Sequence, residues 1–162
     1  HGVRVDSSQV PLRFVPGLPD NFSISADPFR LDALTEAPLT VVPLLPGLGS
    51  AAKGLARLLP RSLADGLLSG FRKVAAVGTQ PAWYPLASME LAARLHLQRG
   101  GRVIHLFLHS SELAPGFAPH LPDQASVDRL LTRTRAFLAW LSGRCALRGA
   151  TLGEFAAPED PA

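Results

Sequence analysis

Cysteine is nearly absent from this sequence, and charge is scarce. Cys145 is the single cysteine among 162 residues, which excludes an internal disulfide and a zinc site built from several thiolates. Charged residues make up 18% of the chain and hydrophobic residues 47%, a balance that favours a globular domain over a disordered one. Apolar runs stay well short of the ~20 residues that a membrane helix needs, so we expect no membrane span.

Clusters of positive charge are missing as well. The formal net charge is +3, but the basic residues are scattered and no three of them are consecutive. Proteins that bind nucleic acid usually gather Lys and Arg in one run or on one face. We therefore expect no nucleic-acid partner and attribute the positive balance to composition.

An initiator methionine is also lacking. The chain begins His1-Gly2-Val3-Arg4, so a glycine leads directly into an alternating strand pattern over residues 2–8. Such a start is typical of the middle of a domain, where a helix has just ended. We expect the first half of the domain to precede His1. The sequence does not fix the location of the protein; we favour the cytoplasm, although an export signal could lie in that preceding part.

Spacing of apolar residues predicts the elements of the first two thirds. Residues 9–37 are rich in proline and read as loop, and alternation predicts a second strand over 39–42. Leucine spacing over 46–80 predicts two short helices or an insertion. A further helix is expected to begin at a Ser88 cap and to end before Gly100.

The C-terminal third carries the clearest helix signals. Apolar residues recur at helical spacing over four turns between Asp123, which we expect to cap the helix, and Gly143, which should end it. Thr151 and Glu154 match a capping box and predict a final short helix. Residues 158–162 are expected to be a disordered tail.

The run over residues 102–109 is almost purely apolar and predicts a strand covered on both faces, as in a parallel sheet. The order helix, strand, loop, helix favours βα units. We therefore predict an α/β fold, specifically part of a (β/α) barrel, with residues 1–157 forming one domain.

A histidine ends this predicted strand. His109 shares a face with positions 103, 105 and 107 and stands where the strand gives way to the polar loop 110–122. In parallel α/β folds the carboxyl ends of the strands form the active-site face, and histidine is the side chain most often used for proton transfer. We predict that His109 is catalytic; the alternative is a histidine that only caps loop carbonyls.

The pair His105 and His109 also suggests a shared zinc ion. On a strand, four residues at ~3.3 Å each place the two Cα atoms roughly 13 Å apart. Each zinc ligand lies only ~2.1 Å from the metal, so we reject a shared ion. His105 is then a core residue or supports another side chain.

The loop after His109 offers further candidates. Ser110 and Ser111 suggest a serine hydrolase, but neighbouring strand residues point in opposite directions and the sequence has no Gly-x-Ser-x-Gly elbow. Ser110 and Glu112 are candidates for binding a substrate. For Glu112 the alternative is a bond to loop amides.

Asp6 and Trp83 complete the predicted site. Asp6 ends the strand over 2–8 and could face the same cleft as His109, or form an Asx turn with Ser8. Trp83 and Tyr84 lie in a proline-flanked loop before a helix. Exposed aromatic rings there suit stacking on a sugar, with packing against the rim of a barrel as the alternative.

Several of these motifs together resemble the C-terminal end of a polysaccharide deacetylase. The matching segments are Ile104 to Leu113, Pro115-Gly116, the long helix from about 124, Ala150 to Phe155, Gly2 to Ser8, Asp20-Asn21-Phe22, Pro28-Phe29 and Leu34 to Pro38. The resemblance is to the nodulation-deacetylase type, similar to carbohydrate esterase family 4 and found in exopolysaccharide and cell-wall biosynthesis. It covers most of the chain and is poorest over 46–80.

The resemblance implies a distorted (β/α) barrel that removes acetyl groups from the amino sugars of a glycan. The family uses a divalent, zinc-like metal held by one Asp and two His, an aspartate base, and a late-strand histidine that protonates the leaving amine. Only the last of these roles falls on this sequence, at His109. The metal ligands would precede His1, so we predict no metal ligand in this chain and no activity for the isolated chain.

Two other functions stay open from the sequence. A non-catalytic barrel fragment or glycan-binding module would use Trp83 and Tyr84 to stack on sugar. A serine-type hydrolase would use Ser110 or Ser111 instead.

Overall fold

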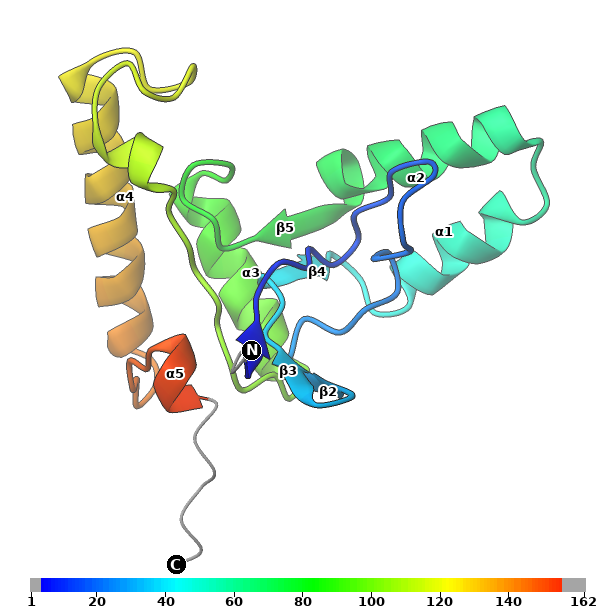
Figure 1. Ribbon diagram of the computed structural model, residues 1–162, viewed down its shortest axis with the longest axis horizontal. Coiled ribbons are helices and arrows are strands. Elements are labelled where there is room, and N and C mark those ends of the chain that lie inside the picture. Colours follow the sequence, from blue (N-terminus) through cyan, green and yellow to red (C-terminus); the bar gives the residue numbers. More distant parts are fainter. Residues whose placement is uncertain (1–3, 156–162) are drawn as a thin grey trace, which may run out of the picture.

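The computed structural model describes residues 4–155, so the tail expected at 158–162 lies outside the described residues. The chain has a mixed α/β fold, which confirms the broad class (Figure 1). Its elements follow in the order β1 (Val5–Asp6), β2 (Phe29–Leu31), β3 (Leu34–Glu36), β4 (Val41–Pro43), α1 (Leu48–Ala56), α2 (Arg61–Ala75), β5 (Ala76–Gly78), α3 (Leu86–Gln98), the 3₁₀ helix η1 (Ser110–Leu113), α4 (Gln124–Ser142) and α5 (Leu152–Phe155).

The strands form two small sheets, and within residues 4–155 they do not close into a barrel. β1 pairs with β3 in parallel, but β2 pairs with β3 and β4 with β5 in antiparallel fashion. The expected parallel sheet is therefore wrong for two of the three pairings. β2 and β3 are joined by a two-residue turn in which Asp32 has a φ of 52°, and such a turn returns the chain antiparallel.

Helices α1 and α2 form an antiparallel hairpin between β4 and β5 (Figure 1). This confirms the two helices expected over 46–80. Near the end of that range, however, Ala76–Gly78 form the strand β5. Helix α3 begins after Pro85, not at a Ser88 cap, because the fixed φ of proline suits the start of a helix. It ends as predicted, since Gly100 adopts a φ of +86° directly after the last turn.

The C-terminal helices follow the sequence closely. The Asp123 carboxylate accepts a hydrogen bond from the Ser126 N–H at 2.8 Å, and α4 ends at Gly143. The Thr151 hydroxyl and the Glu154 carboxylate bond each other's backbone N–H, so the expected capping box starts α5.

The segment 102–109, the central segment, is extended but pairs with no strand, so its predicted place in a sheet is wrong. Side chains take up its backbone groups in place of a strand neighbour. Thr40 Oγ1 accepts from the His105 N–H at 2.8 Å, and Thr79 Oγ1 donates to the His105 carbonyl at 2.9 Å. Asp27 Oδ1 accepts from the Arg102 N–H at 3.0 Å. These bonds satisfy backbone groups of the segment without a ladder of strand hydrogen bonds.

The central segment nevertheless lies between two parts of the core, as its apolar character predicts. In Figure 1 it rises between α3 and α4 towards η1. Ile104 and Leu106 pack on a cluster from α3 and α4 that includes the fully buried Met89 and Phe137. Phe107 packs instead on the cluster around Phe22 and Phe71. Alternating side chains therefore face opposite sides.

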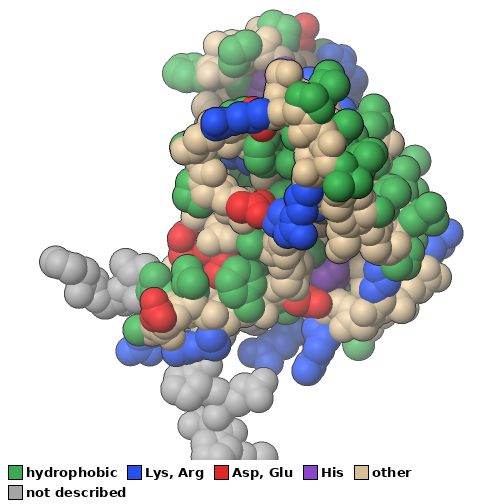
Figure 2. Space-filling view, turned by 90° about the vertical axis from the view of Figure 1, so that its right-hand side faces the viewer, with side chains coloured by type: hydrophobic (Ala, Val, Ile, Leu, Met, Phe, Trp, Pro, Cys, Tyr) green, Lys and Arg blue, Asp and Glu red, His purple; other side chains and the backbone are tan. Residues whose placement is uncertain are grey.

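Within residues 4–155, no helix combines the length and hydropathy that crossing a membrane requires. Figure 2, seen from the side of the turn between α1 and α2, shows Lys and Arg side chains as separate groups among hydrophobic and acidic ones. On this face the basic residues form no continuous surface.

Candidate functional site

The central segment delivers His109 to the surface. The residue has a φ of −77° and a ψ of 145°, an extended backbone that leads directly into η1. Its side chain is exposed, whereas the preceding residues 103–108 are partly buried. The imidazole of His109 packs edge-on against Phe107, with 4.9 Å between ring centroids and 80° between ring planes. His109 therefore combines a fixed backbone with an accessible ring.

Glu112 fixes that backbone from inside the loop. Only 2% of Glu112 is exposed, and its Oε2 accepts from the His109 N–H at 2.9 Å. In return, the His109 carbonyl accepts from the Glu112 N–H at 2.9 Å. The carboxylate thus takes the loop-amide role that the sequence left open as its alternative. Ser110, the first residue of η1, lies exposed beside it.

His120 joins this group and was missed from the sequence. Its Nε2 lies 3.2 Å from Glu112 Oε1, and its side chain is about half exposed. A buried carboxylate that holds an exposed imidazole is the arrangement by which enzymes orient a histidine for proton transfer. His120 follows Glu112 by eight positions across an irregular stretch, so no local sequence pattern predicts the pair.

An aromatic row connects His109 to Trp83. The Trp83 and Phe107 ring centroids lie 5.4 Å apart in an edge-to-face arrangement, and Phe107 in turn contacts His109. Trp83 is 43% exposed. The guanidinium of Arg72 lies over the Trp83 ring, 5.3 Å from its centroid. The structure therefore brings two sequence-predicted site residues, Trp83 and His109, onto one row.

Asp6 lies in a different environment. Its carboxylate accepts from the N–H groups of Ser7 at 2.7 Å and Ser8 at 3.1 Å, which is the Asx turn considered as its alternative. Asp6 stands opposite Glu36 in the parallel pairing of β1 and β3. Among residues 4–155 no hydrogen bond or ion pair joins Asp6 to His109.

Glu36 is a second residue that sequence reasoning missed. It is fully buried, and its Oε1 accepts from the Gln9 N–H at 3.1 Å, while Oε2 has no partner among the described residues. Burial raises the pKa of Glu36 and the negative charge of Asp6 adds to this rise, against the opposing effects of the Gln9 N–H and His105. An acidic residue in a segment read as loop gave no sign of burial.

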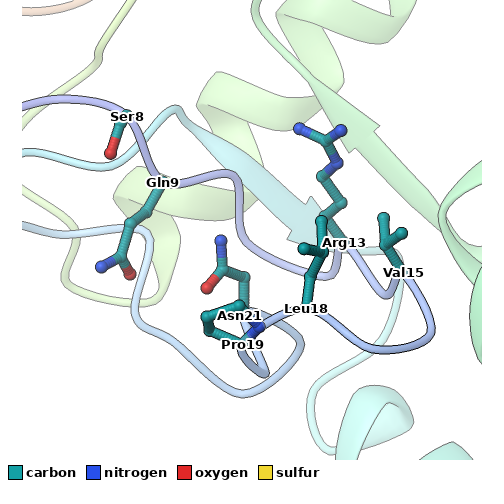
Figure 3. Close-up of a pocket in the computed structure, with 7 residues that line it drawn as sticks. All are labelled: Ser8, Gln9, Arg13, Val15, Leu18, Pro19 and Asn21. Atoms are coloured by element: carbon teal, nitrogen blue, oxygen red, sulfur yellow. The ribbon is translucent and has the colours of Figure 1, made fainter.

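The described part of the surface includes two hollows whose lining can be compared with the predicted site. The N-terminal hollow, about 270 Å³, is formed by the loop between β1 and β2 (Figure 3). Its lining residues are Ser8, Gln9, Arg13, Val15, Leu18, Pro19 and Asn21. Figure 3 shows the Arg13 guanidinium pointing away from the Gln9 and Asn21 amides, so these polar groups do not converge. None of the predicted site residues lines it.

The Trp83 hollow, about 400 Å³, lies between the end of α2 and the loop before α3. Its polar and aromatic lining comes from Arg72, Lys73, Trp83, Tyr84 and Ser88. This hollow contains the predicted site residue Trp83.

The resemblance implies a divalent metal, and the described residues do not fit one. Within residues 4–155 no group of three His, Cys, Asp or Glu side chains is close enough to hold an ion. The Nδ1 atom of His105 is engaged by the Ala37 carbonyl at 2.8 Å.

Comparison of the chain with protein-family models, curated proteins and solved structures finds no match.

Proposed function

We propose that this chain carries the proton-donor side of a hydrolase that removes acetyl groups from the amino sugars of a glycan, as in polysaccharide deacetylases. The observation that supports this most is the placement of His109, an exposed imidazole at the end of a partly buried segment. The parallel pairing of β1 with β3 is compatible with a distorted (β/α) barrel, which we propose as the architecture of the complete domain.

The step assigned to His109 is protonation of the leaving nitrogen. In amide hydrolysis, water adds to the acetyl carbonyl, the carbon–nitrogen bond breaks, and the nitrogen takes up a proton to leave as an amine. An imidazole holds and releases a proton near neutral pH, and a positioned acid of this kind contributes ~10²–10⁴-fold to the rate. The divalent metal that this family uses would have to be held outside residues 4–155.

The sugar-binding part of the proposal rests on Trp83. Its ring is partly exposed and is linked to His109 through Phe107. The face of the Trp83 ring near His109 suits stacking on a sugar. Ser110 is exposed and therefore accessible to a sugar hydroxyl. The same exposure of Trp83 favours the second candidate function, a glycan-binding module without catalysis.

Release of acetate tests this proposal. The natural protein that contains the chain would be incubated with N-acetylglucosamine oligomers and zinc, with acetate and free amine measured together. We expect the two products in equal amounts, and we expect residues 1–162 alone to be inactive. Absence of acetate combined with binding of the oligomers would favour the glycan-binding module. Loss of activity after a serine-directed reagent labels Ser110 or Ser111 would favour the serine hydrolase.

A further inference from the structure

The lining of the Trp83 hollow is positively charged and carries no matching carboxylate. Arg72 and Lys73, in the last turn of α2, both line it. Among residues 4–155, no Asp or Glu oxygen lies within 4.0 Å of either side chain's nitrogens. By contrast, Lys53 pairs with Asp20, and Arg99 donates to the Pro43 and Leu44 carbonyls. Arg72 contacts the Trp83 ring, but neither Arg72 nor Lys73 has a carboxylate partner among the described residues, so both charges can still bind an external anion.

The same hollow offers aromatic and hydroxyl surface. Trp83 and Tyr84 form its aromatic wall, and Ser88 brings a hydroxyl. Burial raises the pKa of Tyr84, with the positive charge of Arg72 acting in the opposite direction, so the phenol stays protonated as a hydrogen-bond donor. Rings and hydroxyls around a charge suit a polar ring compound such as a sugar better than a bare ion.

A buried amide behind this wall has no partner. Gln80 is 1% exposed, and neither its Nε2 nor its Oε1 makes a hydrogen bond among the described residues. It lies with Tyr84 against Gly78, where a Cβ would fall 2.6 Å from Tyr84 Cε2 and 2.9 Å from Gln80 Oε1. Buried polar groups are normally satisfied, and exceptions are found where a ligand or water completes the site. Gln80 is an exception of this kind beside the wall of the hollow.

The hollow adjoins the proposed catalytic residue. Trp83 belongs to the hollow and, through Phe107, to the row that ends at His109. A glycan chain that crosses this row would place one sugar at His109 and another at Arg72. The charge on the second sugar then decides whether the hollow binds it.

We propose that the Trp83 hollow binds an acidic sugar residue, a ring that bears a carboxylate or a phosphate, as a subsite for the glycan that is deacetylated at His109. This inference rests on the proposed function. The anionic group binds Arg72 and Lys73, and the sugar ring lies along Trp83. The substrate class is accordingly an acidic glycan in which an N-acetylated sugar has a charged neighbour.

Binding of matched oligosaccharides tests the subsite without requiring catalysis. Calorimetry on the natural protein that contains the chain would compare three ligands. They are a tetrasaccharide of alternating glucuronic acid and N-acetylglucosamine, a neutral N-acetylglucosamine tetramer, and the same tetramer with one 6-phosphate added. We expect at least one acidic ligand to bind about tenfold or more tightly than the neutral one, because charge-assisted hydrogen bonds contribute on this scale. The stronger of the two identifies the anion. Equal affinity for all three would overturn the proposal.

Variants at the two cations assign the preference to this hollow. The double variant Arg72→Gln, Lys73→Gln should lose it, and Arg72→Lys should keep most of it. The matched control is Arg61→Gln, an exposed arginine at the start of the same helix, which should keep the wild-type preference. If the double variant does not fold, Lys73→Gln alone should weaken the preference severalfold. A preference for acidic ligands that survives the loss of these charges would contradict the assignment.

The two proposals fail separately. Selective binding of the acidic oligosaccharide by a protein that never releases acetate would overturn the proposed function and keep the acidic-sugar site. Release of acetate together with equal affinity for neutral and acidic oligosaccharides would keep the proposed function and overturn the acidic-sugar site.

Discussion

The two ends of the central segment differ in what the fold does with a histidine. His105 and His109 stand four residues apart on the same extended chain. The Nδ1 atom of His105 donates to the buried carbonyls of Ala37, at 2.8 Å, and Pro38, at 3.2 Å. The His109 ring packs edge-on against Phe107 and is exposed. One imidazole is used to hold loops together, and the other is left accessible.

This difference teaches that residue type and spacing did not decide the role of either histidine. At His105, Thr40 and Thr79 bind the backbone while carbonyls bind Nδ1 of the ring, so both the backbone and one ring nitrogen are engaged. At His109, the buried Glu112 binds the backbone alone, so the ring stays available. Rigidity of the main chain with freedom of the ring is what a positioned acid requires.

The largest expected effect is on catalysis at the His109 end. In the natural protein, His109→Ala should lower the rate of acetate release by ~10²–10⁴-fold, as expected for the loss of a positioned acid. Its free energy of unfolding should change by less than about 0.5 kcal/mol, because the side chain is exposed. Single-turnover acetate release and urea unfolding measure the two quantities. A loss of activity below threefold would contradict the assignment.

The converse effect is expected at the His105 end. His105→Ala should reduce the free energy of unfolding by about 1–3 kcal/mol, since two carbonyls in buried residues lose their donor. Urea unfolding at constant pH measures this. His105→Asn is the matched control, because the Asn amide can place an N–H near the position of Nδ1 and should recover part of the loss. Equal stability of wild type and His105→Ala would remove the contrast between the two histidines.

A smaller effect should follow from loosening the support of His109. Glu112→Ala removes the carboxylate that accepts from the His109 N–H and should cost about 0.5–2 kcal/mol of stability, as the loss of a helix cap does. Hydrogen exchange at the His109 amide should accelerate in this variant. Glu112→Gln keeps an acceptor oxygen and should restore most of the protection. Unchanged exchange in Glu112→Ala would show that η1 holds its shape without the side chain.

The local parts of the fold could be predicted from the sequence because their causes are local. Asp123 and Ser126 lie within one turn, as do Thr151 and Glu154, so caps and periodicity were enough to place α4 and α5. The central segment was predicted to be apolar and covered on both sides for the same reason. Its hydrogen-bond partners could not be predicted, because Thr40 is 65 residues away from His105 and contributes a side chain where a strand was expected.

The candidate site divides in the same way. The exposed place of His109 could be predicted, since an apolar run stops there and a polar loop begins. The neighbours of Trp83 could not be predicted. Arg72 lies in the last turn of α2, and it reaches the Trp83 ring because β5 and the loop after it fold back towards that turn. The roles of His120 and Glu36 could not be predicted either. Each depends on a hydrogen-bond partner, Glu112 or Gln9, that lies on the other side of an irregular stretch of chain.

The smallest expected effect concerns pH and belongs to the His105 end, because the charge of His105 acts on the carboxyl group of Glu36. Burial raises the pKa of Glu36 above its usual 4.5, so the folded protein binds this proton more tightly than the unfolded chain. The contribution of Glu36 to the free energy of unfolding is at its full value below pH 4.5. It decreases as the pH rises through the folded-state pKa of this residue. Glu36→Gln removes the titration, so the variant should gain stability relative to wild type between pH 4 and pH 7. Thermal unfolding across this range measures the gain, and a difference that does not change with pH would show that Glu36 titrates alike in both states.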